Sequence, residues 1–182
     1  RAVVLGGHGK AFCAGADLAW MRAMADYTWP QNHADASRLA DMLWTIYSCP
    51  LPVVGRIHGD CYAGGVGLAA VCDVVVAADT MQFCLSEARL GLLPGTVGPY
   101  VVRALGEQAS RRYFATAESF SAGEAHRLGL VAPRREPAVR VQKMAAGECH
   151  ITAPLRDIDI AALDKRSDVV ILKKQALNIS YL

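Results

Sequence analysis

The feature that most constrains the fold is a glycine-containing apolar segment between two valine-rich runs. Residues 53–57 and 74–78 are dominated by Val, Ile and Ala, which predicts two buried strands. Residues 64–71 lie between them, contain three glycines and no charged side chain, and are followed by Asp73, for which we expect a structural role at the helix end. Their length fits a short helix. This alternation of strand, helix and strand predicts an α/β fold.

Other parts of the chain continue the alternation. We expect a strand at 2–5 that enters a glycine-rich turn, helices at 18–25 and 37–48 with a loop through Pro30 between them, and a helix from Pro99 to about Leu105. Ser121 and Glu124 have the spacing of a capping box for a further helix. Gly129 is expected to end that helix, and Leu130 and Val131 to enter a strand.

The sequence pattern changes near Pro133. The letters PRREP are typical of a linker, and the apolar periodicity after them is weaker. We therefore expect a core over residues 1–132 and a mainly helical C-terminal segment over residues 133–182. Because the chain opens directly on an apolar strand, the core is expected to be incomplete at its N-terminal side.

Charge and cysteine usage narrow the class of function. The chain carries 19 basic and 17 acidic residues, and no basic cluster exceeds a doublet, so binding to nucleic acid is not expected. The six cysteines include no C-x-x-C pair, which is typical of reduced thiols in the cytoplasm or, in a eukaryote, the mitochondrial matrix. The histidines show no metal-ligand spacing, and no apolar run is long enough to predict a membrane span.

Two turns made of small residues are candidates for chemistry. They are FCAGADL, residues 12–18, and YAGGVGLA, residues 62–69. Glycine lets the backbone approach a ligand closely, so the turns could aim two backbone N–H groups at one oxygen, aided by the positive end of the helix that begins at Gly64. That arrangement would be an oxyanion hole. The alternative is that both are ordinary tight turns between packed elements.

Four motifs, taken in order, resemble the enoyl-CoA hydratase/isomerase (crotonase) family. They are GKAFCAGADL, GDCYAGGVGLAAVCD, MQFCLSEARLGLLPG and FSAGEAHRLGLV, and the resemblance runs from Arg1 to about Val131. It implies a crotonase-like ββα superhelix that lacks its first strands here. It also implies a homotrimer or dimer of trimers and a coenzyme A thioester as substrate, with no further cofactor and no metal.

The resemblance also implies the roles of individual residues. The backbone N–H groups of Ala16 and Gly64 would hold the thioester carbonyl in an oxyanion hole. Further residues that would contact the substrate or its CoA arm are Ala14, Asp17, Leu18 and Ser86. Negative charge collects on the carbonyl oxygen when the α-carbon becomes enolate-like, and one lost donor typically costs a factor of about 10² to 10³ in rate.

The acid–base residues depart from the pattern of hydratases that use two glutamates. One glutamate is expected three residues after the oxyanion glycine, where this chain has Gly67. The second belongs to a Q-F-x-x-x-E segment, where Glu87 is present. Apolar residues flank Glu87, so burial would raise its pKa and suit it to catalysis. The alternative is a surface glutamate at a helix start capped by Ser86.

Three functions remain open with a single glutamate. The first is a hydratase that adds water to a 2-enoyl-CoA, including a branched one, because the motifs also resemble the methylglutaconyl-CoA and isohexenylglutaconyl-CoA hydratases. There a substrate carboxylate or another side chain could help to position water. The second is an enoyl-CoA isomerase that moves a proton with one glutamate. The third is a non-catalytic subunit that binds CoA. Glu87 together with both turns favours an enzyme.

Overall fold

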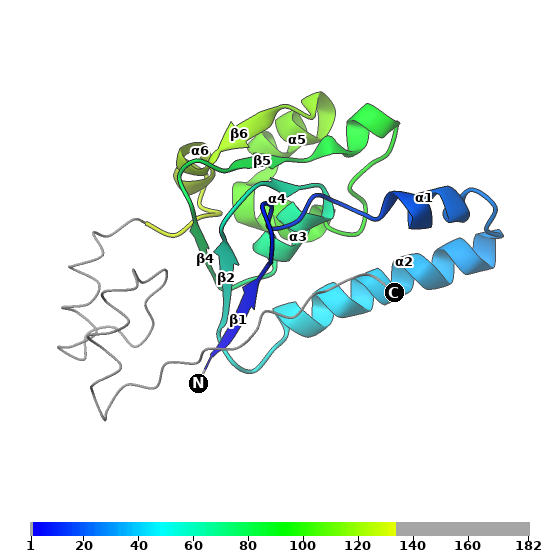
Figure 1. Ribbon diagram of the computed structural model, residues 1–182, viewed down its shortest axis with the longest axis horizontal. Helices are drawn as coiled ribbons and strands as arrows, with labels where there is room; N and C mark the ends of the chain where they lie inside the picture. The colour runs from blue at the N-terminus through cyan, green and yellow to red at the C-terminus, as the bar shows by residue number, and fades with distance from the viewer. Residues whose placement is uncertain (1, 134–182) are drawn as a thin grey trace. The chain divides into compact units, whose positions relative to one another are not determined.

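Two three-stranded sheets and the helices around them organise the part of the chain that the computed structural model describes, residues 2–133 (Figure 1). The elements are β1 (Val3–Gly6), α1 (Leu18–Met24), α2 (Trp29–Tyr47), β2 (Val53–Ile57), β3 (Cys61–Tyr62), α3 (Gly64–Ala70), β4 (Val74–Ala77), β5 (Gln82–Cys84), the 3₁₀ helix η1 (Ser86–Leu90), α4 (Gly98–Leu105), α5 (Glu107–Thr116), β6 (Ser119–Ser121) and α6 (Ala122–Arg127). The expected α/β alternation is therefore present.

The first sheet has the order β1-β2-β4 and is parallel throughout. Its central strand, β2, is buried except at Arg56, which explains why its sequence is nearly all apolar. At Gly55 an added Cβ would lie 3.1 Å from the sulfur of Cys72, so the end of α3 packs closely against this strand. The second sheet has the order β3-β5-β6, with β3 and β5 parallel and β6 antiparallel to β5.

Helix α3 lies in the core that the two sheets share. All of its residues after Gly64 are buried, which accounts for the lack of charge in this segment. Arg103 of α4 donates to the carbonyl oxygen of Ala70 at 2.9 Å and lies over the ring of Tyr47 from α2. Because a helix leaves its last carbonyl groups unpaired, this guanidinium satisfies one of them and links α2, α3 and α4.

Helix α2 is longer than the sequence pattern predicted. It begins at Trp29, whereas the pattern predicted a loop through Pro30 and a start at residue 37. A capping box causes the difference, since the Gln31 side chain accepts from the backbone N–H of Thr28 at 2.8 Å. Pro30 stands in the first turn, where its missing N–H costs nothing.

The end of the described part also differs from expectation. Leu130 and Val131 are buried but form a bend instead of the predicted strand, and only Ala132 bonds to β4, through Val75 at 2.8 Å. Gly129 does end α6, with a φ of +93°. The predicted segment over residues 133–182 lies beyond the described residues, apart from residue 133. The division of the chain at residue 132 stays a prediction.

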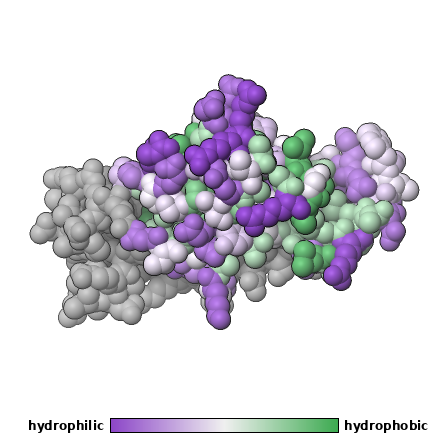
Figure 2. Space-filling model, turned by 90° about the horizontal axis from the view of Figure 1, so that it is seen from above, coloured by the Kyte–Doolittle hydropathy of each residue, from purple (hydrophilic) through white to green (hydrophobic). Residues whose placement is uncertain are grey.

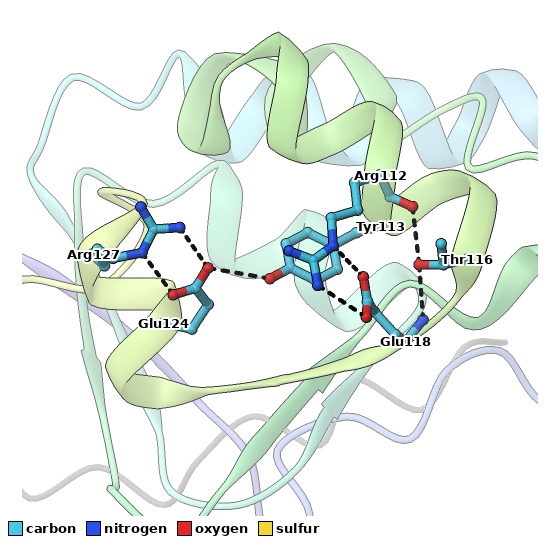
Figure 3. Close-up of polar contacts among 6 residues, drawn as sticks. All are labelled: Arg112, Tyr113, Thr116, Glu118, Glu124 and Arg127. Carbon is cyan, nitrogen blue, oxygen red and sulfur yellow. Dashed lines mark hydrogen bonds and ion pairs between the residues drawn. The ribbon is translucent and has the colours of Figure 1, made fainter.

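The capping box predicted at Ser121 is half formed. Ser121 accepts from the backbone N–H of Glu124 at 3.2 Å, as expected for an N-cap. The Glu124 carboxylate instead accepts from Arg127 at 2.6 Å and from the Tyr113 hydroxyl at 3.4 Å (Figure 3). Figure 3 also shows Arg112 of α5 paired with Glu118, so polar contacts join α5 to α6 and to the residue before β6.

Asp73 ties the end of α3 to the start of β2. Its carboxylate accepts from the backbone N–H of Val53 at 2.7 Å, and its own N–H donates to the Val53 carbonyl at 2.9 Å. Asp73→Ala is therefore expected to lower the free energy of unfolding by about 1–3 kcal/mol, measured by urea denaturation. Asp73→Asn should lose less because an amide oxygen still accepts. An equal loss in Asp26→Ala, at an exposed turn, would contradict this role.

Candidate active site

The two glycine-containing turns lie side by side. The N–H of Tyr62 donates to the carbonyl of Cys13 at 2.8 Å, and Cys13 forms a parallel bridge with Cys61. The N–H groups of Phe12 and Cys13 both donate to the carbonyl of Asp60, at 3.0 and 3.2 Å. Three backbone hydrogen bonds therefore hold the first turn against the segment that leads into the second.

Glycine is required where the turns meet. A Cβ at position 65 would lie 2.7 Å from the Cβ of Cys13, a separation that packed carbon atoms do not reach. Gly15 has a φ of +106°, which favours glycine, and its α-carbon faces the side chain of Ala63. The small residues in these turns thus let two backbone segments approach each other closely.

Ala63 holds a conformation that residues with a side chain rarely adopt. Its φ is 48° and its ψ is −120°, and its N–H donates to the carbonyl of Cys84 at 2.8 Å. Such backbone strain persists only where the surroundings impose it, and it is frequent at functional sites. Here it reverses the chain between β3 and α3, so that Gly64 begins the helix.

Two backbone N–H groups at these turns are free to bind a ligand. Within residues 2–133, neither Ala16 nor Gly64 donates its N–H to a protein acceptor. A Cβ at Gly64 would meet no atom within 4 Å, so the space beside this backbone is open. Ala16 is exposed and follows Gly15 at the junction of the turns. The structure thus brings together the two segments that carry the predicted N–H donors.

Glu87 lies in η1, directly after β5. Its side chain is partly buried, and the oxygen Oε2 is buried without a hydrogen-bond partner among the described residues. Burial raises the pKa of this carboxyl above its ordinary value, because the charged form loses hydration. Ser86 is the first residue of η1 and its side chain caps nothing there, so the cap that the alternative of a surface glutamate assumed is absent.

Strand pairing brings the Glu87 segment to the strained turn. Cys84 pairs with Tyr62, and the Ala63 N–H donates to the carbonyl of Cys84. Glu87 follows three residues later in η1. The segment that carries Glu87 therefore begins next to Ala63, where the chain turns into α3.

No room exists at Gly67 for a second carboxylate. A Cβ at this position would lie 2.2 Å from Cγ1 and 2.5 Å from the Cβ of Val97, which precedes α4. Val97 is 4% exposed and belongs to the core. The side chain of Val97 therefore fills the space that any side chain at position 67 would need.

Three further predicted residues belong to the first turn itself. Ala14, Asp17 and Leu18 are all exposed, and Leu18 is 68% exposed. Asp17 also has a local role that the sequence analysis missed, since its carboxylate accepts from the backbone N–H of Trp20 at 2.9 Å and caps α1. An interaction with a CoA arm is not required to explain Asp17.

Asp60 was also missed by the sequence analysis. Its carboxylate accepts from the hydroxyl of Tyr62 at 2.8 Å and from the backbone N–H of Gln82, the first residue of β5, at 2.9 Å. The only signal in the sequence is an acidic side chain between a strand and a glycine-rich turn. That signal does not reveal which backbone groups the carboxylate reaches.

Exposed apolar side chains follow Glu87 along the chain. Leu90, Leu92 and Leu93 are each about half exposed or more, and Leu93 reaches 83%. On the face seen in Figure 2, apolar side chains gather in patches between strongly polar ones.

Across residues 2–133 no helix is long and apolar enough to cross a membrane, and no group of three or more metal-binding side chains is present. Five cysteines in this range are free thiols.

Comparison with known sequences gives one family. The family model described as enoyl-CoA hydratase/isomerase matches residues 1–150. Enoyl-CoA hydratase ACTT6 of Alternaria alternata is 38% identical over 133 residues, which are 71% of this chain and 41% of that protein. A Thermus thermophilus protein with an enoyl-CoA hydratase name is 36% identical over 156 residues, 85% of this chain and 62% of its own length. The chain spans about half the length of these curated relatives.

Solved structures show the same fold. Pseudomonas aeruginosa AtuE superposes with a TM-score of 0.73 and 32% identity, over 95% of this chain and 68% of its own. An enoyl-CoA hydratase from Shewanella pealeana gives a TM-score of 0.69 and 42% identity, over 70% of this chain and 48% of its own. These likenesses confirm the α/β fold class.

The raised pKa of Glu87 predicts a pH-dependent gain of stability in Glu87→Gln. The folded state binds more protons than the unfolded state between the ordinary carboxyl pKa of about 4.3 and the raised value, so wild-type stability falls as pH rises through that window. The variant should therefore gain stability relative to wild type between pH 4 and pH 7 in urea denaturation. Glu107→Gln, which alters an exposed side chain, is the matched control. A difference that is flat with pH would contradict burial of Glu87.

The contact between positions 67 and 97 predicts coupled stability effects. Gly67→Ala should lower the free energy of unfolding by about 1–3 kcal/mol, because its methyl group overpacks against Val97. The double variant Gly67→Ala/Val97→Ala should lose less than the sum of the two single losses, with a coupling energy of at least about 0.5 kcal/mol in urea denaturation. Additive losses would mean that the two positions are not in contact.

Proposed function

Because this chain belongs to the enoyl-CoA hydratase/isomerase family, we propose that it carries the catalytic site of an enoyl-CoA hydratase. The resemblance to the crotonase family seen in the motifs is thereby confirmed. The substrate would be a 2-enoyl thioester of coenzyme A, and the product the corresponding 3-hydroxyacyl thioester. The proposal is supported most directly by a partly buried carboxyl, Glu87, that follows the strand paired with the turn at Ala63; within residues 2–133, its Oε2 and the N–H groups of Ala16 and Gly64 have no hydrogen-bond partner.

The turns would stabilise the charge that develops on the substrate. With the thioester carbonyl oxygen between the N–H groups of Ala16 and Gly64, both donors would face the oxygen that becomes negative. These donors are fixed in advance by the contacts between the turns, so they need little reorganisation during the reaction. Each is expected to contribute a factor of about 10² to 10³ in rate.

Glu87 would carry the proton in both halves of the addition. Its carboxylate would take a proton from water as the water oxygen bonds to C3 of the enoyl group, which leaves an enolate on the thioester. The protonated Glu87 would then return a proton to C2, and the carboxylate would be restored. Burial raises the pKa of the Glu87 carboxyl, so its protonated form, which returns the proton to C2, costs less free energy than it would for an exposed glutamate.

An isomerase is the second candidate, and the packing at Gly67 favours it over a two-glutamate hydratase. Position 67 is a glycine with Val97 packed against it, so Glu87 is the sole glutamate at the two positions where such hydratases carry theirs. One carboxyl is sufficient to move a proton between C2 and C4 of an enoyl thioester. A non-catalytic subunit that binds CoA is the third candidate, and it gives no reason for a buried unpartnered carboxyl.

The acyl group of the substrate, the residues along the CoA arm, the assembly and the location are further proposals. A branched substrate of the methylglutaconyl or isohexenylglutaconyl kind would place its acyl group beside Glu87, where the exposed Leu90, Leu92 and Leu93 offer apolar contacts. Ala14, Asp17, Leu18 and Ser86 would line the path of the CoA arm. Assembly as a homotrimer or dimer of trimers is a prediction from the family resemblance. A location in the cytoplasm or mitochondrial matrix is a prediction from the cysteine usage.

Loss of enoyl-thioester absorbance tests the proposed function. In the full-length protein, we expect hydration of a straight-chain 2-enoyl-CoA or of 3-methylglutaconyl-CoA, and a loss of about 10² to 10⁴ in kcat for Glu87→Gln. Glu107→Gln is the matched control and should keep full activity, since its side chain is exposed on α5. Conversion of a 3-enoyl-CoA without hydration would favour the isomerase. Activity that survives in Glu87→Gln would contradict the role of this residue.

A further inference from the structure

We infer that Asp60 is a positioning residue that sets the two N–H turns at a fixed separation from the segment that carries Glu87. The inference rests on the proposed function, because the separation matters only if the two turns bind the thioester carbonyl and Glu87 transfers the proton. Asp60 precedes β3 and is itself partly buried. It would act through the backbone groups that it binds, without contact with the substrate.

The backbone of Asp60 holds the first turn. Its carbonyl oxygen accepts from the N–H groups of both Phe12 and Cys13, at 3.0 and 3.2 Å. The chain reaches Ala16 three residues after Cys13. The carbonyl of Asp60 therefore anchors the turn that presents the Ala16 N–H. If Asp60 moved, this turn would move with it.

The carboxylate of the same residue holds the other two segments. Oδ1 accepts from the N–H of Gln82 at 2.9 Å, and Oδ2 accepts from the Tyr62 hydroxyl at 2.8 Å. Gln82 begins β5, which leads to Glu87, and Tyr62 comes immediately before the strained turn at Ala63. The hydrogen bond to Asp60 raises the pKa of Tyr62, as expected for a phenol that donates to a carboxylate.

Three segments of the site thus converge on one residue. Hydrogen bonds to an ionised carboxylate are about twice as strong as neutral ones, so the Asp60 carboxylate fixes its partners more firmly than an amide or water would. Pairing between β3 and β5 covers only two residue pairs, so the sheet alone gives limited support. A shift of about 1 Å between a carbonyl-binding group and a proton-transfer group can cost a factor of about 10² in rate.

Asp73 provides a matched control in the same protein. Its carboxylate also accepts from the backbone N–H of a strand residue, Val53 of β2, at 2.7 Å. This bond lies at the end of α3 opposite Gly64 and reaches neither turn nor the Glu87 segment. Loss of either carboxylate removes a strand-initiating hydrogen bond, but only Asp60 connects the groups of the site.

The first test compares Asp60→Ala, Asp60→Asn and Asp73→Ala in the full-length protein with a 2-enoyl-CoA substrate. Asp60→Ala should lower kcat by about 10 to 10² while KM changes by less than about threefold, because the site loses alignment. Asp60→Asn should recover most of kcat, since its amide oxygen can accept from Gln82 and its amide nitrogen can donate to Tyr62. Asp73→Ala should keep kcat within about twofold despite a comparable loss of stability.

Equal losses of kcat in Asp60→Ala and Asp73→Ala, in proportion to their losses of stability, would overturn the inference. Failure of Asp60→Asn to exceed Asp60→Ala would also overturn it. If Asp60→Ala does not fold, Tyr62→Phe takes its place, because it removes one of the two carboxylate contacts and should lower kcat to a smaller extent.

Amide hydrogen exchange gives a readout that does not depend on activity. Asp60→Ala should speed exchange in residues 12–16 and 82–87, and Asp73→Ala should leave both segments as in wild type. Unchanged exchange in these segments would overturn the inference even if activity falls. A wild-type protein without activity on any enoyl-CoA would refute the proposed function, whereas the exchange data would still decide the role of Asp60.

Discussion

The close approach of two backbone turns is the constraint on which the site depends. Cys13 lies so near to α3 that position 65 admits only glycine, and Ala63 takes a positive φ to turn the chain into the helix. The same contacts leave the N–H groups of Ala16 and Gly64 without protein acceptors among residues 2–133. The close approach of the two turns therefore has two results. It requires small residues, and it leaves backbone donors that a ligand can use.

The burial of α3 also limits which acid–base side chains the site can contain. The helix is covered on all sides, so its side chains must match their neighbours in volume, and Val97 occupies the space at Gly67. Glu87 reaches the site from a different segment, through the pairing of β5 with β3. We expect a site with one carboxyl and two backbone donors, in which the proton moves through Glu87 alone.

Local sequence patterns predicted the strongly apolar parts of the fold, but neither the first turns of α2 nor the polar helix α5. The strand at 53–57 and the helix that begins at Gly64 were found because burial leaves a clear apolar signal. Strands β3, β5 and β6 have only two or three residues and carry no periodicity, so no local pattern reveals them. The role of Asp60 was invisible for a related reason, because it depends on contacts between segments that are 22 residues apart.

The account rests on a thioester carbonyl held between two backbone N–H groups, and its vibrational frequency reports this contact directly. Infrared difference spectra of the full-length protein with a ¹³C-labelled enoyl-CoA would isolate the stretching band of that carbonyl. We predict a clear shift to lower frequency relative to the thioester in water, and the same shift in Glu87→Gln, because the donors belong to the backbone. A bound thioester whose band stays at its frequency in water would contradict the account.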